Sequence, residues 1–338
     1  MKRKQKKAVS DLSSVENERR SPCLPPEILK VIFEDFLIYP DFLIDMHHAA
    51  WRPPSHRENA KMKTSIIAVC RDWYHAGIHL LYKEASLWHL AELGMLTRTL
   101  RESPRPLRRI VTGLYIACVV PCVDELDMML FHTLYSIIRL CPNLRRLSFV
   151  PNPDQEEVVK LPALVDILTQ PGQMDQKIST SLTDLRLGGH CFQEWGFEPF
   201  IPLLSPTVET LTLNNVGMDV HTPPAPPLTW PKLEWLRCFT NDFREGISPV
   251  QCSMVWAMPS LKRLSHISPI PVTPSPLLDK CGAGLEYLNI YSDAHSLQAY
   301  LDKTPKLKHL VLQRHYEGFQ GFISHPTLQS LMFGRSNR

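Results

Sequence analysis

The sequence lacks any apolar run long enough to cross a bilayer. Its long stretches without a charged residue, such as 110–123 and 246–261, are shorter than the roughly 18 apolar residues of a spanning helix. The basic amino terminus is followed by polar residues instead of the apolar core of a secretory signal, and no Asn-x-Ser/Thr glycosylation site occurs. These absences favour a soluble globular protein outside the secretory pathway, with no membrane partner.

Cysteine shows no disulfide or metal-binding pattern. The nine cysteines are odd in number and scattered, without a Cys-x-x-Cys pair. Several lie in apolar patterns, where cysteine behaves as a small hydrophobic residue, and we expect Cys118 and Cys122 in a core for this reason. A reducing compartment, cytoplasmic or nuclear, is the expected location.

Signatures of common enzymes are also missing. The chain has no Gly-x-Ser-x-Gly elbow, no phosphate-binding Gly-x-x-x-x-Gly-Lys loop and no His-Glu-x-x-His pair. Gly282 and Gly284 lack the third glycine of a dinucleotide loop and are expected in a turn. His47, His48 and His56 are expected in solvent. We therefore predict no catalytic residue, no metal and no cofactor.

Basic charge is concentrated at the amino terminus. The formal net charge is +3, yet residues 1–20 hold seven basic and three acidic residues, so the rest of the chain is nearly neutral. We expect 1–20 to be a disordered tail, whose tract Lys2–Lys7 resembles a nuclear-import signal. The neutral remainder argues against nucleic acid as a partner.

Two short helices are predicted near the start of the chain. From Leu24 to Leu37 apolar residues recur every four positions, and a second run of helical period extends from Ser65 to Tyr82. Pro25 and Pro26 suit a first helical turn. Helices this short cannot enclose a core alone, so each apolar face requires the other helix or a partner.

The two runs contain a pair of motifs, Leu-Pro-Pro-Glu-Ile-Leu from Leu24 and Val-Cys-Arg-Asp-Trp from Val69. Together they resemble an F-box of the fungal type, over residues 21–88, with an insert at 38–63 that is expected as an exposed loop. The resemblance implies docking on a Skp-family adaptor and, through it, a cullin. The adaptor-binding residues that it implies are Leu24, Pro25, Pro26, Ile28, Leu29, Ile32, Phe33, Val69, Cys70 and Trp73.

A short pattern then repeats through 89–338: an apolar residue, another three positions later, and another two after that. The nine copies begin at Val111, Leu144, Leu182, Val208, Leu233, Leu261, Leu285, Leu307 and Leu328. The second and third apolar residues of each copy lie on one face of a strand. From Leu182 on, copies recur every 21 to 28 residues, which resembles leucine-rich repeats. The predicted fold class is α/β, a helical module followed by a solenoid with a curved parallel sheet.

The solenoid is expected to be irregular. Leucine-rich repeats usually have Asn or Cys at the ninth position of each unit, where the side chain bridges backbone groups. Here only Asn152 and Asn241 fit that pattern. We therefore expect uneven connections between the strands.

Large side chains stand at the outward positions of several predicted strands. Trp, Tyr and Arg dominate binding hot spots, so these positions are predicted to bind a target protein. The predicted residues are Arg186, Trp235, Arg237, Phe239, Arg263, Tyr287 and Tyr291. A competing interpretation is that the chain's own loops cover them.

A helical module that needs a partner, joined to a repeat surface, is typical of an adaptor protein. The resemblance implies a substrate-recognition adaptor of a cullin-type ubiquitin ligase, which contributes proximity rather than covalent chemistry. The alternative is a repeat scaffold whose helices form an amino-terminal cap, without a link to ubiquitin.

Overall fold

The structure is a computed structural model that describes residues 24–36, 54–104, 106–118, 124–149, 181–188, 204–214, 228–239, 256–267, 275–290, 294–313 and 324–333. The chain divides into two compact units, Met1–Leu81 and Tyr82–Arg338. The predicted tail at 1–20 and the predicted target-binding residue Tyr291 lie outside the described residues.

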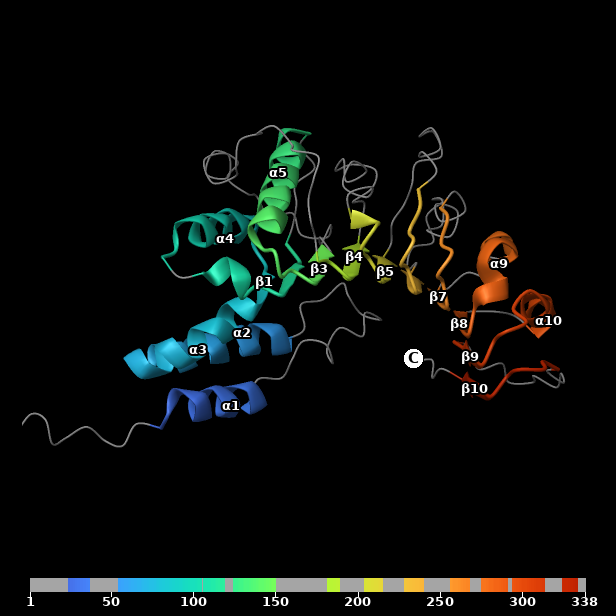
Figure 1. Ribbon diagram of the computed structural model, residues 1–338, viewed down its shortest axis with the longest axis horizontal. Helices are drawn as coiled ribbons and strands as arrows, with labels where there is room; N and C mark the ends of the chain where they lie inside the picture. The colour runs from blue at the N-terminus through green and yellow to red at the C-terminus, as the bar shows by residue number, and fades with distance from the viewer. Residues whose placement is uncertain are drawn as a thin grey trace, which may run out of the picture. The chain divides into compact units, whose positions relative to one another are not determined.

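Three helices build the first unit: α1 (Pro26–Phe36), α2 (Pro54–Ala68) and α3 (Arg71–Lys83) (Figure 1). Their core consists of Leu29, Phe33, Ala76 and Leu80, with Ile32, Ile66 and Trp73 packed against it. The rings of Phe33 and Trp73 lie 5.0 Å apart between centroids. The apolar face of α1 is thus buried by residues of α2 and α3.

The prediction of one helix from Ser65 to Tyr82 is wrong. The chain turns at Val69 and Cys70, where α2 ends and α3 begins, and the Tyr74 N–H already bonds the Cys70 carbonyl at 2.9 Å. Asp72 stabilises the new amino terminus because the helix dipole favours an anion there.

The prediction of a loop over 38–63 is wrong from Pro54 onward. Helix α2 begins at Pro54, because proline suits the first turn of a helix. Residues 38–53 lie outside the described residues.

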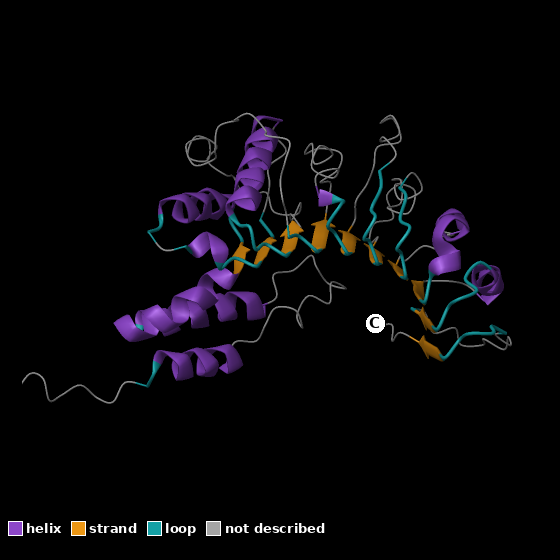
Figure 2. Cartoon of the chain, viewed as in Figure 1, coloured by secondary structure: helices purple, strands orange, loops and turns teal. Residues whose placement is uncertain are grey.

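The second unit is built on a ten-stranded parallel sheet, in which the strands follow one another in chain order. The strands are β1 (Glu84–Leu87), β2 (Gly113–Ile116), β3 (Arg146–Phe149), β4 (Asp184–Gly188), β5 (Thr210–Asn214), β6 (Trp235–Phe239), β7 (Arg263–Ile267), β8 (Tyr287–Ile290), β9 (His309–Leu312) and β10 (Ser330–Phe333). The helices are α4 (Leu90–Glu102), α5 (Asp124–Leu140), α9 (Ser275–Cys281) and α10 (Ala294–Asp302), with short 3-10 turns at Leu107–Arg109 and Gly282–Gly284. The strands form one curved row, and these four helices lie on its convex side (Figure 2). The predicted α/β class with a parallel sheet is confirmed.

The nine predicted strands are present and lie in one register. Leu236 of β6 pairs with Leu264 of β7, which pairs with Leu288 of β8, and all three side chains are fully buried. Equivalent leucines align in the other strands. Only in β10 are the corresponding side chains exposed, Leu331 among them. Inward apolar residues of successive strands therefore form one stack.

The sequence analysis missed one strand and misplaced a boundary. β1 pairs with β2 through Ala85 and Leu114, although 84–87 was assigned to the helical module. The units divide between Leu81 and Tyr82, before the predicted boundary at 88. Ala85 occupies the position that leucine holds elsewhere, so the pattern was not recognised.

A ladder of backbone hydrogen bonds joins successive strands at their amino-terminal ends. From β2 to β9, one carbonyl before each strand accepts two N–H groups from the next: the Arg145 carbonyl accepts from Thr183 at 2.8 Å and Asp184 at 3.0 Å. The Lys308 carbonyl does the same for Gln329 and Ser330. These paired bonds satisfy backbone groups at an edge that water would otherwise enter.

Hydroxyl groups also bridge the turns that precede the strands. Ser181 Oγ donates to the Pro142 carbonyl at 2.8 Å, and Ser260 Oγ donates to the Pro231 carbonyl at 2.6 Å. Thr327 Oγ1 donates to the carbonyl of Pro305 at 3.0 Å. Each hydroxyl precedes the first apolar residue of its copy. The observed bridging side chains thus lie just before the first apolar residue of a copy. Asn152 and Asn241, which fit the ninth-position pattern of leucine-rich repeats, lie outside the described residues.

Candidate binding surfaces

Helix α1 exposes apolar side chains on the side opposite its core. Leu24 is 50% exposed, Ile28 47% and Val31 56%. Ile28 and Val31 are three residues apart, so their side chains lie on one side of the helix. The Pro25 carbonyl accepts hydrogen bonds from the N–H groups of Ile28 and Leu29, both at 3.0 Å, which anchors the start of the helix. Pro25 and Pro26 are exposed as well.

Four of the ten predicted adaptor-binding residues are buried or half-buried in the core of the first unit. Leu29 and Phe33 are 1% and 2% exposed and belong to the core of the first unit, so their side chains do not reach its surface; adaptor binding by these two residues stays a prediction. Ile32 and Trp73 are half-buried against the same core. Of the neighbouring residues Ile28 and Leu29 only Leu29 faces inward, whereas Ile32 and Phe33 both contact the core.

At the turn between α2 and α3, Val69 and Cys70 are exposed, and Val69 reaches 59%. Val31 of α1 was missed in the sequence analysis although it is as exposed as Ile28. The sequence could have indicated Val31, because it is an apolar residue about one helical turn after Ile28.

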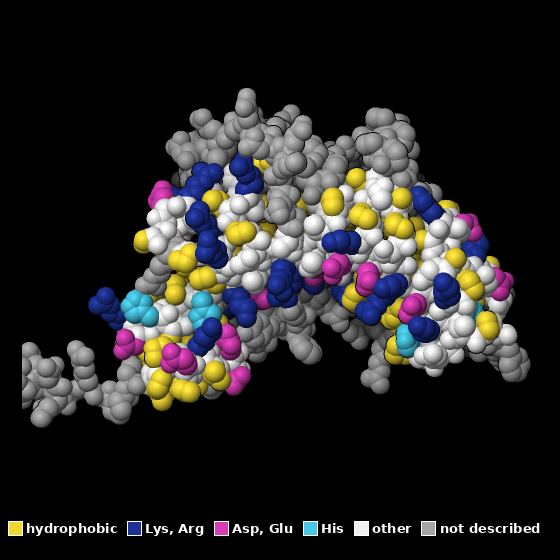
Figure 3. Space-filling model, in the orientation of Figure 1, with side chains coloured by type: hydrophobic (Ala, Val, Ile, Leu, Met, Phe, Trp, Pro, Cys, Tyr) yellow, Lys and Arg dark blue, Asp and Glu magenta, His cyan; other side chains and the backbone are white. Residues whose placement is uncertain are grey.

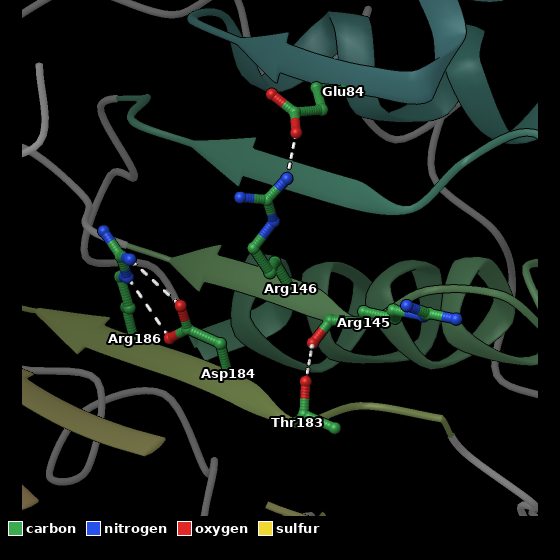
Figure 4. A network of polar contacts seen from close by, with 6 residues as sticks. All are labelled: Glu84, Arg145, Arg146, Thr183, Asp184 and Arg186. Carbon is green, nitrogen blue, oxygen red and sulfur yellow. Dashed lines mark hydrogen bonds and ion pairs between the residues drawn. The ribbon is translucent and has the colours of Figure 1, made fainter. Parts of the chain in front are cut away.

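In the second unit, charged side chains on the outward face of β1 to β4 form ion pairs with one another. Glu84 of β1 bonds Arg146 of β3, and Arg186 donates to both carboxylate oxygens of Asp184 on the same strand, at 3.2 and 2.9 Å (Figure 4). Because its guanidinium is bonded and largely buried, Arg186 does not join the other predicted target-binding residues.

Four predicted target-binding residues do come together around Trp235. The guanidinium carbon of Arg237 lies 3.4 Å from the Trp235 ring centroid, and that of Arg263 lies 5.5 Å from it. The ring of Tyr287 stands edge-on to the indole, at 6.4 Å between centroids. Trp235 Nε1 donates to Ser265 Oγ at 3.4 Å. These five residues are named here the Trp235 cluster.

Strand register positions the Trp235 cluster. Trp235, Arg263 and Tyr287 are direct neighbours across β6, β7 and β8, and Arg237 follows Trp235 by two residues on the same face. Burial raises the pKa of the Tyr287 hydroxyl above its ordinary value. The hydroxyl therefore stays protonated at neutral pH and can donate a hydrogen bond.

Phe239 lies further along β6, next to Ile267 of β7. Both side chains are half-buried, as are Trp235 and Tyr287, and Arg263 is exposed. In the competing interpretation the chain's own loops would cover these side chains. Within the described residues, the indole, phenol and guanidinium groups of the Trp235 cluster pack on one another. The segments that follow β6, β7 and β8 lie outside the described residues, so covering by loops stays a prediction.

A row of alternating charges borders the Trp235 cluster at the amino-terminal ends of the strands. Lys262 Nζ lies 2.7 Å from Glu234 Oε1, and Lys308 Nζ lies 2.9 Å from Glu286 Oε2. The bond to Lys308 lowers the pKa of Glu286, and the bond to Glu234 raises the pKa of Lys262. Basic and acidic side chains lie beside one another along this part of the molecule (Figure 3).

Several titratable side chains of the second unit are buried and are held in their neutral forms. His266 is fully buried in β7, where burial lowers its pKa to about 4, and neither ring nitrogen has a hydrogen-bond partner among the residues that the structure describes. Burial raises the pKa of the Cys118 and Cys141 thiols to about 12. Such a thiol stays protonated at neutral pH and is a weak nucleophile.

Within the described part of the chain, no three His, Cys, Asp or Glu side chains are grouped so that they could hold a metal ion. None of the helices found there is both long enough and apolar enough to cross a membrane. When the chain is compared with known proteins, no family model matches it and no curated protein has a significantly similar sequence.

Proposed function

We propose that this protein is a substrate-recognition adaptor of a cullin-type ubiquitin ligase. The first unit docks on a Skp-family adaptor, which connects it to a cullin, and the outward face of the sheet binds the target protein. The proposal combines the F-box resemblance of the motifs at Leu24 and Val69 with the side chains that the first unit leaves exposed. The protein itself performs no covalent chemistry on this proposal.

The observation that supports adaptor docking best is the exposed apolar side of α1. A helix that already buries Leu29 and Phe33 in its own core gains nothing from exposing Ile28 and Val31 to water. Exposed apolar side chains grouped on one element are typical of protein interfaces. A groove on a partner that covered them would gain about 25 cal/mol per Å² of apolar area.

The sheet supports the second half of the proposal. Ten strands in one register present a continuous outward face, on which the Trp235 cluster combines aromatic and guanidinium groups. These are the residue types found most often in binding hot spots. A target held there would be positioned for modification by the enzyme that the cullin recruits.

Affinity purification of the full chain from its native cell, scored for a Skp-family adaptor and a cullin, tests the proposal. We compare the parent with Ile28→Ala/Val31→Ala, and use Met95→Ala, an exposed apolar residue of α4, as the matched control. Each truncation should remove about 1 kcal/mol of binding, so the double variant should capture at least tenfold less adaptor. The Met95 control should capture as much as the parent.

Absence of a Skp-family adaptor and a cullin from the parent's partners would overturn the proposal in favour of a scaffold unrelated to ubiquitin. Equal capture by the parent and the α1 double variant would show that the exposed side of α1 is not the docking surface.

A further inference from the structure

Arginines are grouped where α4 leads into β2 and where α5 leads into β3. Arg98 and Arg101 lie near the end of α4, and Arg108 and Arg109 belong to the short 3-10 turn that follows it. Arg145 stands just before β3. All five side chains are exposed, and basic side chains gather over α4 and the turn after it (Figure 3). These five residues are named here the arginine patch.

Hydrogen bonds bring the turns that carry these arginines side by side. Asn143, in the turn before β3, donates from Nδ2 to the Arg109 carbonyl at 2.7 Å. The Arg145 N–H donates to the Thr112 carbonyl at 2.9 Å. Since β2 and β3 are neighbours in the sheet, about 4.8 Å apart, Arg109 and Arg145 belong to one surface.

The turn that carries Arg108 and Arg109 is held in one conformation. Pro104 and Pro106 restrict its backbone, and the buried Leu107 side chain anchors it in the core. The Arg109 N–H donates to the Pro106 carbonyl at 2.9 Å. Arginines on a turn that is already ordered lose less conformational entropy when a ligand binds.

Neighbouring carboxylates do not balance the charge of the arginine patch. In the described parts of 98–118 and 133–149 the one acidic residue is Glu102, so the patch and this glutamate together have a net charge of +4. Among the residues that the structure describes, none of the five guanidinium groups forms an ion pair. The Arg145 guanidinium points away from the ion pair of Arg146 (Figure 4).

Helix termini explain only part of this arrangement. Arg101 lies in the last turn of α4, where a cation stabilises the negative end of the helix dipole. Arg108, Arg109 and Arg145 are not part of an α-helix. Exposed like charges that lie close together repel one another, so the patch costs stability until an anion binds.

We propose that the arginine patch binds a segment of a partner protein that is rich in aspartate and glutamate. Guanidinium groups bind carboxylates through paired, charge-assisted hydrogen bonds. Met95, three residues before Arg98 on the same side of α4, is 46% exposed and can contact an apolar side chain of the segment. The arginine patch shares no residue with α1 or with the Trp235 cluster, so this inference does not depend on the proposed function.

Two other anionic partners fit the arginine patch less well. Single-stranded nucleic acid stacks its bases on exposed aromatic side chains, and the aromatic residues described in 98–118 and 133–149 are buried: Tyr115, Tyr135 and Phe149. An anionic membrane surface is bound by helices that present a large apolar face. Met95 is the one exposed large apolar side chain of α4, which is described throughout.

Fluorescence anisotropy of the full chain with labelled peptides tests the inference. The probe is an oligo-glutamate peptide with a central leucine, and the comparison peptide has glutamine in place of every glutamate. The parent should bind the glutamate peptide at least about tenfold more tightly than the glutamine peptide, a difference of about 1.4 kcal/mol. Binding should weaken as salt is added, because salt screens exposed charges.

Charge reversal identifies the residues that bind. Arg108→Glu/Arg109→Glu should lower the affinity for the glutamate peptide at least about tenfold, because each change replaces an attraction by a repulsion. Arg108→Gln/Arg109→Gln should give a smaller loss, and it decides the matter if the glutamate variant does not fold. Lys232→Glu/Lys306→Glu makes the same change in net charge at two exposed lysines outside the arginine patch, and should bind nearly as tightly as the parent.

Equal binding of the glutamate and glutamine peptides would overturn the inference, as would full binding by both the Arg108→Glu/Arg109→Glu and the Arg108→Gln/Arg109→Gln variants. Tighter binding of single-stranded RNA or of phosphatidylserine vesicles than of the glutamate peptide would replace the acidic segment by another class of anion and so also overturn it. Capture of the Skp-family adaptor by the parent tests the proposed function separately, so either proposal can fail alone.

Discussion

Glu84 of β1 and Arg146 of β3 form an ion pair that passes over the intervening strand β2. Gly113 stands between them in the register, and its lack of a side chain leaves the space in which they meet. A Cβ at position 113 would lie 3.3 Å from the Tyr115 ring and 3.4 Å from Glu84 Cγ. A side chain here would make an ordinary contact with Glu84, and the Tyr115 ring would have to shift by a few tenths of an ångström.

Removing the cation of this pair should destabilise the second unit. Arg146→Met leaves the buried Glu84 carboxylate without its arginine and should lower the free energy of unfolding by about 3 kcal/mol, measured by urea denaturation. Glu84→Gln in the same chain should restore part of the loss, since an amide costs less to bury than a carboxylate. If the double variant is no more stable than Arg146→Met, the pair does not account for the effect.

Leu29 and Ile28 are adjacent in sequence but should differ in their effect on folding. Leu29→Ala should destabilise the first unit by about 2–5 kcal/mol, because it leaves a cavity in the core. Ile28→Ala should cost well under 1 kcal/mol, as most surface substitutions do. Hydrogen exchange of the α1 and α3 amides measures both. Similar losses of protection in the two variants would contradict the burial described here.

His266 should make the second unit sensitive to acid. Its folded pKa of about 4 lies below the unfolded value of about 6.5, so protons bind the unfolded state more tightly. Stability from this group is fully present above pH 6.5 and falls as the pH decreases toward 4, by roughly 3 kcal/mol in total. His266→Leu should remove this part of the pH dependence, as followed by urea unfolding between pH 4 and pH 7. His309→Gln, on the outward face, should retain it.

Gly282 should not tolerate a side chain. A Cβ there would lie 2.5 Å from the backbone carbonyl oxygen of Lys303, which must then move. Gly282→Ala should cost about 1–3 kcal/mol through overpacking, measured by thermal or urea unfolding. Ala283→Ser, at the exposed neighbouring position, serves as the control and should leave stability within about 0.5 kcal/mol of the parent.

The positions of nearly all strands could be predicted from the sequence. Inward residues such as Leu236 and Leu288 recur at fixed intervals within each copy, and the alternation of a strand depends only on neighbouring residues. The first helix could also be predicted, because its apolar residues recur every four positions and this period too depends only on neighbouring residues. β1 was missed because alanine at 85 gives a weaker apolar signal than leucine does.

The candidate surfaces depended on tertiary structure. Leu29 and Ile28 are equally apolar, and only packing against Ala76 and Leu80 of α3 decided that Leu29 faces the core. Outward positions could be inferred from the strand pattern, but the contact of Arg237 and Arg263 with one indole depends on the register of β6 and β7 and on side-chain conformation. Glu84 and Arg146 are separated by 62 positions, and no local pattern relates them. Local periodicity thus determined the elements of this chain, whereas contacts between distant residues decided which side chains remain available to a partner.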